Sequence, residues 1–262
     1  MRNIKLVIQY DGTEFHGWQK QPNLRTVQGE LDQAIERVTT AAPLTMASGR
    51  TDSGVHALGQ VVSFQTPSRL ETDVLLRALN ALLPGDIRIL SAVDVPLEFH
   101  ATLHAVSKRY RYQVDNQLHA DPFQRRISWH QPKTLDVAAM HEAGQVLLGT
   151  HDFRCFETEY PNRASSVRTI VGLDVRKVGE LIQIEVEADG FLYNMVRAIT
   201  GSLVLIGKRN RAPQWLADVL RGMDRRLAGP TAPPQGLFLL YVVYPAENPP
   251  APVLPATSEP LE

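Results

Sequence analysis

The chain has 262 residues, of which 44% are hydrophobic and 21% are charged, and its formal net charge is −1. This composition is ordinary for a soluble globular protein, and the charge balance does not by itself indicate nucleic-acid binding. The single cysteine, Cys155, excludes an internal disulfide framework, and no apolar run approaches the roughly 18 residues of a membrane span.

Strands and helices interleave along the chain without a regular β-α repeat. Alternating or β-rich runs predict strands at 4–10, 43–48, 59–66, 87–95, 106–114, 167–178, 180–188 and 236–244. Apolar residues at helical spacing predict helices at 26–40, 72–83, 134–148, 194–207 and 212–223. Thr26, Thr72 and Thr134 stand where helix N-cap residues are expected. The order favours an α+β fold, with helices packed on a mostly antiparallel central sheet.

The predicted elements divide into two similar lobes that meet near residue 105. We expect an N-terminal lobe over 1–105 and a C-terminal lobe over 106–245. From Pro245 onward the sequence holds six prolines and three glutamates with no basic residue, so 246–262 is predicted to be a disordered tail. The first apolar run is interrupted at Lys5 and Gln9, too early for a signal peptide. With one cysteine, this favours the cytoplasm.

The stretch SGRTDSGVHA, residues 48–57, has the character of a shaped loop. Gly49 and Gly54 allow tight turns and close approach of the backbone to a ligand. Between them lies Asp52, a carboxylate of ordinary pKa about 3.9, ionised at pH 7 and therefore a poor general base but an available nucleophile. An aspartate in such a turn can equally serve only to hydrogen-bond its own backbone. The loop is the best candidate site, with that alternative open.

The predicted strand 106–114 offers aromatic and basic side chains in alternation. One face carries Lys108, Tyr110 and Tyr112, and the other carries Arg109 and Arg111. The aromatic face can stack an unpaired base, and the reverse face can contact phosphate. Tyrosines that simply pack a core would give the same pattern.

The predicted helix 194–207 carries a clear apolar stripe and one arginine, Arg197. On a helical wheel Arg197 lies roughly 150° from the centre of that stripe, which indicates a surface position. Tyr193 and Val204 lie on the same side, so this face can also border a cleft. There an arginine would pair with a carboxylate and keep it ionised.

No complete motif for a metal or a nucleotide cofactor is present. The stretch 201–210 lacks the spacing and the hydroxyl residue of a phosphate-binding loop, and His100 and His104 lack the glutamate of a zinc-protease helix. Basic residues exceed acidic ones in 100–130 and in 195–230, and they can neutralise phosphates if they converge in space. Scattered solvated arginines would explain the same excess.

Taken together, GRTDSGVHA, KRYRY, FLYNMVR and TAPPQGLFL resemble the tRNA pseudouridine synthase A family. YDGTEFHGWQ, HDFRCF and SVRTI extend the resemblance, in order, to about Tyr244. The resemblance implies isomerisation of uridine to pseudouridine at positions 38, 39 and 40 of the tRNA anticodon stem-loop, without metal or organic cofactor. It also implies the pseudouridine synthase fold, with the active site in a cleft between two lobes, and a homodimer.

The resemblance assigns roles to four residues. Asp52 matches the nucleophilic aspartate, Tyr110 the tyrosine that contacts the base, Arg197 the arginine paired with the aspartate, and Arg50 the residue that helps to displace the base. His56 lies inside the motif and receives no catalytic role. Attack at C6 of the ring and attack at C1′ of the sugar both remain open.

Three positions depart from the family pattern: Ser53, Thr102 and Gln235 replace a common alanine, arginine and histidine. None removes a group that the chemistry needs. Two rival functions remain: a non-catalytic RNA-binding module, and a nucleoside or glycoside hydrolase. The second usually needs another carboxylic acid, and no second motif carries one.

Overall fold

The computed structural model describes residues 1–158 and 165–245, so the predicted tail 246–262 lies outside the described residues. The strands are β1 (Arg2–Tyr10), β2 (Met46–Ala47), β3 (His56–Thr66), β4 (Ile87–Val95), β5 (Ser107–Asp115), β6 (Trp129–His130), β7 (Gly149–Asp152), β8 (Val167–Val178), β9 (Leu181–Ala188) and β10 (Leu237–Val243). The helices are α1 (Val27–Thr39), α2 (Thr72–Leu82), α3 (Val137–Gly144), α4 (Met195–Gly207) and α5 (Trp215–Gly222), with short 3₁₀ turns η1 (Gln145–Leu147), η2 (Arg154–Phe156), η3 (Arg225–Leu227) and η4 (Pro234–Gly236).

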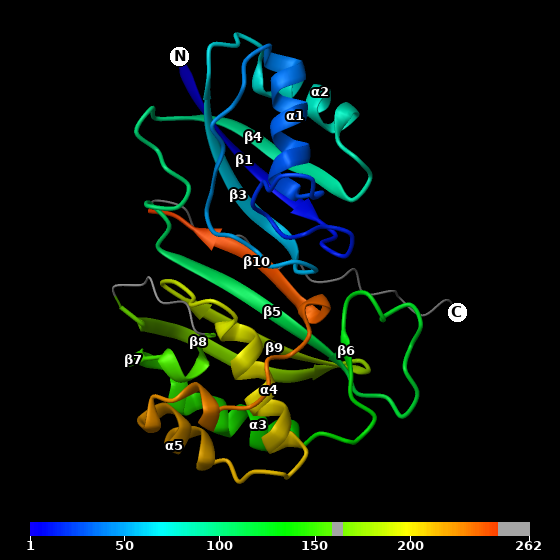
Figure 1. Ribbon diagram of the computed structural model, residues 1–262, viewed down its shortest axis with the longest axis vertical. Helices are drawn as coiled ribbons and strands as arrows, with labels where there is room; N and C mark the ends of the chain where they lie inside the picture. Colours follow the sequence, from blue (N-terminus) through cyan, green and yellow to red (C-terminus); the bar gives the residue numbers. More distant parts are fainter. Residues whose placement is uncertain (159–164, 246–262) are drawn as a thin grey trace, which may run out of the picture.

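One mixed, mostly antiparallel sheet runs through the described chain in the order β4-β1-β3-β10-β5-β9-β8-β7 (Figure 1). The last strand in sequence, β10, lies in its middle, parallel to β3 and antiparallel to β5. Because Phe238 pairs with His56, the start of β10 lies directly beside the end of the GRTD loop. The α+β prediction is confirmed, and the position of β10 joins the two halves of the sheet.

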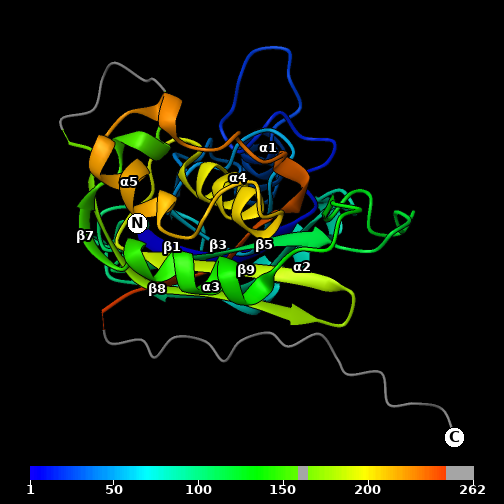
Figure 2. The same ribbon diagram turned by 90° about the horizontal axis from the view of Figure 1, so that it is seen from below.

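Helices cover each half of the sheet with apolar side chains. α1 and α2 pack on the half formed by β1, β3 and β4, while α3 packs on β8 and α4 on β5 (Figures 1 and 2). α5 packs on α3 and on the turns η1 and η2. The stripe of α1 buries Leu31 and Ile35, and nearly every residue of α4 is buried. No helix in the two described segments combines the length and the apolar character that crossing a membrane requires.

Most predicted elements are present; the differences lie mainly at their ends and in two short strands that were not predicted. Thr26 is the N-cap of α1 and accepts a hydrogen bond from the amide of Gly29, as expected. Thr72 and Thr134 are not caps: Glu71 precedes α2 without a side-chain bond, and Asp136 caps α3 by accepting from the amide of Ala139. Aspartate and threonine can both accept this bond, so identifying the cap residue required knowing where the helix begins. The strands β6 and β7 were not predicted, because runs of two and four residues give too little alternation.

Candidate active site

The GRTD loop is fastened to the N-terminal segment at several points. The carbonyl of Thr51 accepts a hydrogen bond from the amide of Trp18 at 3.0 Å, and its hydroxyl bonds to that of Tyr10 at 2.8 Å. The amide of Val55 closes the turn on the carbonyl of Asp52 at 3.1 Å. The hydroxyl of Ser53 donates to the carbonyl of Phe15. These bonds fix the backbone that carries Asp52.

The two glycines of the loop serve different purposes. Gly54 has φ +78°, a conformation that side chains rarely adopt, so the expectation of a tight turn is confirmed there. Gly49 has no such strain. A Cβ at Gly49 would lie 3.3 Å from Nζ of Lys108, so this glycine gives room to a lysine of β5.

His56, which received no role from the sequence, links four segments behind the loop. Its Nδ1 accepts a hydrogen bond from the amide of Gly12 at 3.0 Å. Its Nε2 lies 3.0 and 3.1 Å from the carbonyls of Arg126 and Gln235, which requires the Nε2–H tautomer. The ring stacks on Phe238 with centroids 4.7 Å apart and is almost fully buried. His56 is therefore a structural residue that positions the start of β3.

The same contacts predict a pH-dependent stability. Burial lowers the pKa of His56, although Asp11 and the two carbonyls partly oppose this. The unfolded chain therefore binds a proton more readily than the folded one, and stability falls as pH drops below the unfolded pKa of about 6.5 toward the folded value. His56→Phe keeps an aromatic ring but leaves the Gly12 amide without its acceptor, which should cost about 2–3 kcal/mol at pH 7.5.

Urea unfolding of both proteins at pH 7.5 and 5.5 checks this expectation. The stability difference between wild type and His56→Phe should shrink at the lower pH, because only the wild type loses the contribution of this group. A difference that is the same at both pH values would contradict the neutral, buried histidine.

Asp52 and Arg197 meet at the junction of the two halves of the sheet. Nη1 of Arg197 donates to Oδ2 of Asp52 at 3.3 Å, across 145 positions of sequence. The exposed fractions of the two side chains are 27% for Asp52 and 15% for Arg197. Burial raises the pKa of Asp52 above its ordinary value, and the charge and hydrogen bond of Arg197 oppose that rise. The guanidinium of Arg197 therefore offsets part of the effect of burial on this carboxylate.

Two further bonds orient Arg197. Its Nε donates to the carbonyl of Ala232 at 2.7 Å, and Nη1 also donates to Oδ1 of Asn194 at 2.7 Å. Asn194 precedes α4 at φ +62°, a left-handed conformation that asparagine tolerates better than most residues. Its amide in turn donates to the hydroxyl of Thr158. Asn194 supports Arg197 and was missed by the sequence analysis, although its place before a helix was a usable signal.

The surface position of Arg197 that the helical wheel indicated is wrong. The segment just before β10 covers that side of α4: the amide of Ala232 donates to the Arg197 carbonyl, and the amide of Gly229 donates to the hydroxyl of Ser202. A Cβ at Gly201 would lie 1.8 Å from the carbonyl oxygen of Pro230, so the two backbones touch. A wheel cannot register a covering segment from elsewhere in the chain.

A cavity of about 720 Å³ opens beside the pair, within the size range of small-ligand sites. Its lining includes Asp52, Arg197, Tyr110 and Arg50, so all four predicted residues lie at one cavity. Tyr110 is buried, and its ring meets that of Phe191 edge to face at 5.0 Å. Burial raises the pKa of the Tyr110 hydroxyl, so this group stays protonated at neutral pH. Arg50 is exposed at the cavity wall.

The other tyrosine on this face of β5 has a packing role. Tyr112 is fully buried, and its hydroxyl donates to the carbonyl of Pro233 at 2.7 Å. Tyr112 thus holds the same segment that orients Arg197. Of the two tyrosines predicted to stack a base, only Tyr110 lines the cavity.

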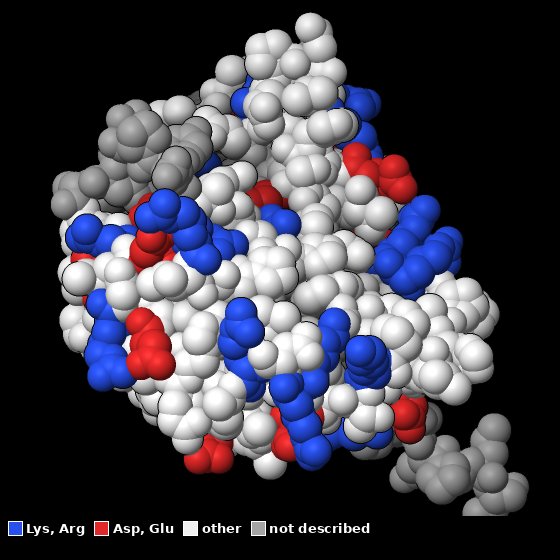
Figure 3. Space-filling view, turned by 60° about the horizontal axis from the view of Figure 1, so that its bottom comes forward, with Lys and Arg blue, Asp and Glu red and all other residues white. Residues whose placement is uncertain are grey.

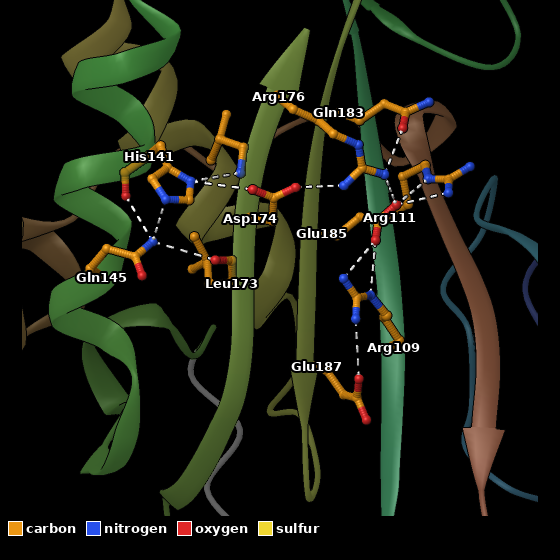
Figure 4. Close-up of polar contacts among 11 residues, drawn as sticks. Arg109, Arg111, His141, Gln145, Leu173, Asp174, Arg176, Gln183, Glu185 and Glu187 are labelled. Atoms are coloured by element: carbon orange, nitrogen blue, oxygen red, sulfur yellow. Dashed lines mark hydrogen bonds and ion pairs between the residues drawn. The ribbon is translucent and has the colours of Figure 1, made fainter. Parts of the chain in front are cut away.

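The reverse face of β5 does not offer free arginines to phosphate, contrary to the expectation. Arg109 and Arg111 both pair with Glu185 of β9 at 2.8 Å, and Arg109 also reaches Glu187 (Figure 4). Burial would raise the pKa of Glu185, but the surrounding guanidinium groups outweigh it and hold that pKa below its ordinary value. These arginines stabilise the sheet.

The basic excess predicted in 195–230 is partly neutralised by local ion pairs. Arg209, Arg221 and Arg226 pair with Asp136, Asp218 and Asp224, respectively. On the face of the molecule shown in Figure 3, basic side chains lie in several separate groups, with acidic side chains beside some of them. Within 1–158 and 165–245, no cluster of three or more histidine, cysteine, aspartate or glutamate side chains has the arrangement of a metal site.

Comparison with known proteins identifies the family. The family model described as tRNA pseudouridine synthase matches residues 6–102 and 143–245. The tRNA pseudouridine synthase A of Thermoanaerobacter sp. (strain X514) is 43% identical over 244 residues, covering 93% of this chain and 100% of the relative. That of Geobacillus kaustophilus is 43% identical over 245 residues, covering 93% and 95%.

A relative from Clostridium tetani, tRNA pseudouridine synthase A 2, is 40% identical over 245 residues and covers 93% of this chain and 99% of the relative. Among solved structures, a chain of a Cbf5-Nop10-Gar1 complex matches 76% of this chain and 53% of its own at 12% identity, with a TM-score of 0.32. That last similarity is too weak to add to the argument. The family match and the near full-length relatives show that this chain belongs to the tRNA pseudouridine synthase family.

Proposed function

We propose that this protein isomerises uridine to pseudouridine at positions 38, 39 and 40 in the anticodon stem-loop of tRNA, with Asp52 as the nucleophile. The observation that carries the proposal is the Asp52–Arg197 pair on the wall of a cavity that Tyr110 also lines. Membership of the tRNA pseudouridine synthase family supports tRNA as the substrate. The specific positions rest on the resemblance of the motifs.

The reaction breaks the C1′–N1 bond of uridine and forms a bond from C1′ to C5. N1 ends with the proton and C5 loses one, so the product has the mass of the substrate. Asp52 attacks either C1′ of the sugar or C6 of the ring, and an ionised carboxylate is suited to both. Arg197 opposes the effect of burial on the pKa of Asp52 and so favours the ionised form. The net change is neither oxidation nor hydrolysis, so the reaction demands no redox cofactor.

The target base must leave its stack to reach Asp52. Eversion of a nucleotide costs a few kcal/mol, and base–aromatic stacking can return about 1–3 kcal/mol. Tyr110 is placed to contact the everted base, and Arg50, exposed at the cavity wall, is placed to occupy the space it vacates. In this scheme Tyr110 acts as a neutral contact, since burial raises its pKa.

We also propose that the chain forms two lobes, 1–105 and 106–245, and that these lobes form the two walls of the active-site cleft. The lobes meet where β10 joins β3 to β5, beside the GRTD loop. We also propose that the enzyme acts as a homodimer in the cytoplasm and that the two subunits share each tRNA.

Incubation with unmodified tRNA transcripts, followed by chemical mapping of pseudouridine, tests reaction, substrate and position together. The expected product has unchanged mass and a modified residue at position 38, 39 or 40. Release of free uracil would instead identify a hydrolase. Binding of transcript with no modification of any uridine would identify a non-catalytic RNA-binding module.

A further inference from the structure

Lys108 lies in the same cavity as the proposed nucleophile. It stands two residues before Tyr110 on β5, so both side chains point to the same face of the strand, and both line the cavity. The Lys108 ammonium adjoins the GRTD loop, because a Cβ at Gly49 would lie 3.3 Å from it. The sequence analysis grouped Lys108 with the tyrosines but gave it no role.

Lys108 has no ion-pair partner among the described residues. Its neighbours Arg109 and Arg111 both pair with carboxylates of β9, whereas no carboxylate in the described parts of the chain lies within ion-pair distance of Lys108. Burial lowers the pKa of Lys108, and the nearby charge of Arg168 lowers it further. A half-buried cation beside other cations is unfavourable unless an anion joins it.

Arg168 extends this positive charge, since its charge acts on Lys108. Within 1–158 and 165–245, Arg168 of β8 donates to the backbone carbonyls of Ser165 and Val167 and to no carboxylate. Its Nε lies 3.3 Å from where a Cβ of Gly190 would be, next to Phe191 of the cavity wall. Strands β5 and β8 thus bring two positive charges close together beside the cavity.

We propose that Lys108, with Arg168 beside it, forms a phosphate subsite in the Asp52 cavity, which binds the RNA backbone next to the everted nucleotide. This inference rests on the proposed function and adds to it. A lysine ammonium is a point charge that suits a phosphate oxygen, and phosphate contacts fix the register of a nucleic acid on a protein. The subsite holds the flanking backbone while Tyr110 and Asp52 act on the base and sugar.

The test compares Lys108→Met with Lys177→Met as a matched control. In the register of the sheet, Lys177 of β8 lies opposite Ile182 of β9, and Lys108 of β5 lies opposite Ala188 of β9. The two lysines therefore lie beside opposite ends of β9. With an unmodified tRNA transcript, Lys108→Met should raise KM about tenfold and leave kcat within about threefold of wild type. Lys177→Met should match wild type in both.

Binding to the same transcript at several salt concentrations gives a readout that does not need turnover. Lys108→Met should lower the slope of log affinity against log salt by about one ion, and Lys108→Arg should restore it. An unchanged slope, or a fall in kcat at saturating RNA with unchanged affinity, would overturn the subsite. If no variant or wild type makes pseudouridine but the slopes still differ, the proposed function fails and the phosphate subsite stands.

Discussion

Replacing Asp52 by Asn is expected to abolish pseudouridine formation, lowering kcat by at least about 10⁴-fold, as loss of a covalent nucleophile does elsewhere. Binding of the tRNA transcript should stay within about threefold of wild type, because phosphate contacts dominate nucleic-acid affinity. Single-turnover assays at saturating enzyme measure the first quantity, and a binding titration measures the second.

The structure gives reasons to expect an intact fold in this variant. An asparagine oxygen can still accept from Nη1 of Arg197, and Arg197 keeps its bonds to Ala232 and Asn194. The turn at residue 52 depends on its backbone carbonyl, which accepts from the amide of Val55. Asp52→Asn thus removes the negative charge and little else.

A matched control is Asp73→Asn, which also removes one carboxylate. Asp73 forms an ion pair with Arg77 on α2, and both side chains are exposed, whereas the Asp52–Arg197 pair is largely buried. Pairs of that kind contribute about 0–1 kcal/mol, so activity should be unchanged. Normal turnover by Asp52→Asn, with its identity verified by mass, would refute the nucleophile assignment.

The fold was predictable because alternating and helical patterns report burial directly. The strand containing Tyr110 and Tyr112 and the apolar stripe of α4 both appear where the periodicity places them. The patterns gave no information on the neighbours of each strand. The central place of β10 between β3 and β5 depends on pairings across more than a hundred residues, which local periodicity does not record.

The site residues likewise differ in whether a local sequence pattern or a long-range contact determines their environment. Asp52 stood out because two glycines marked a shaped loop, and that is a local signal. Arg197 was ambiguous because its environment is set by the backbone of residues 229–232, which arrives from beyond the helix. The supporting roles of His56 and Asn194 depend on bonds to distant segments as well, and only the preference of asparagine for left-handed backbone was visible locally.

The second large effect concerns Arg197. Arg197→Lys is expected to lower kcat/KM roughly 10- to 100-fold, the range of one to two charge-assisted hydrogen bonds. Lysine keeps the positive charge, but a single ammonium cannot reproduce the planar fork that bonds Ala232 and Asn194 while facing Asp52. Arg226→Lys serves as the control, since Arg226 is 89% exposed and pairs with Asp224, and it should leave activity unchanged.

A pH profile separates a chemical role of Arg197 from a merely structural one. Burial raises the pKa of Asp52 and Arg197 opposes that rise, so weakening the pair lets the pKa climb further. In the proposed mechanism the ionised carboxylate is the active form, so the acid limb of the kcat/KM profile should move to higher pH in Arg197→Lys. It should move further in Arg197→Met, which has no charge. Activity lost equally at every pH would mean that Arg197 only supports the fold at this point. A shift of the acid limb to lower pH would mean that Arg197 does not favour the ionised form of the reacting group, and the proposed electrostatic role of Arg197 would fail.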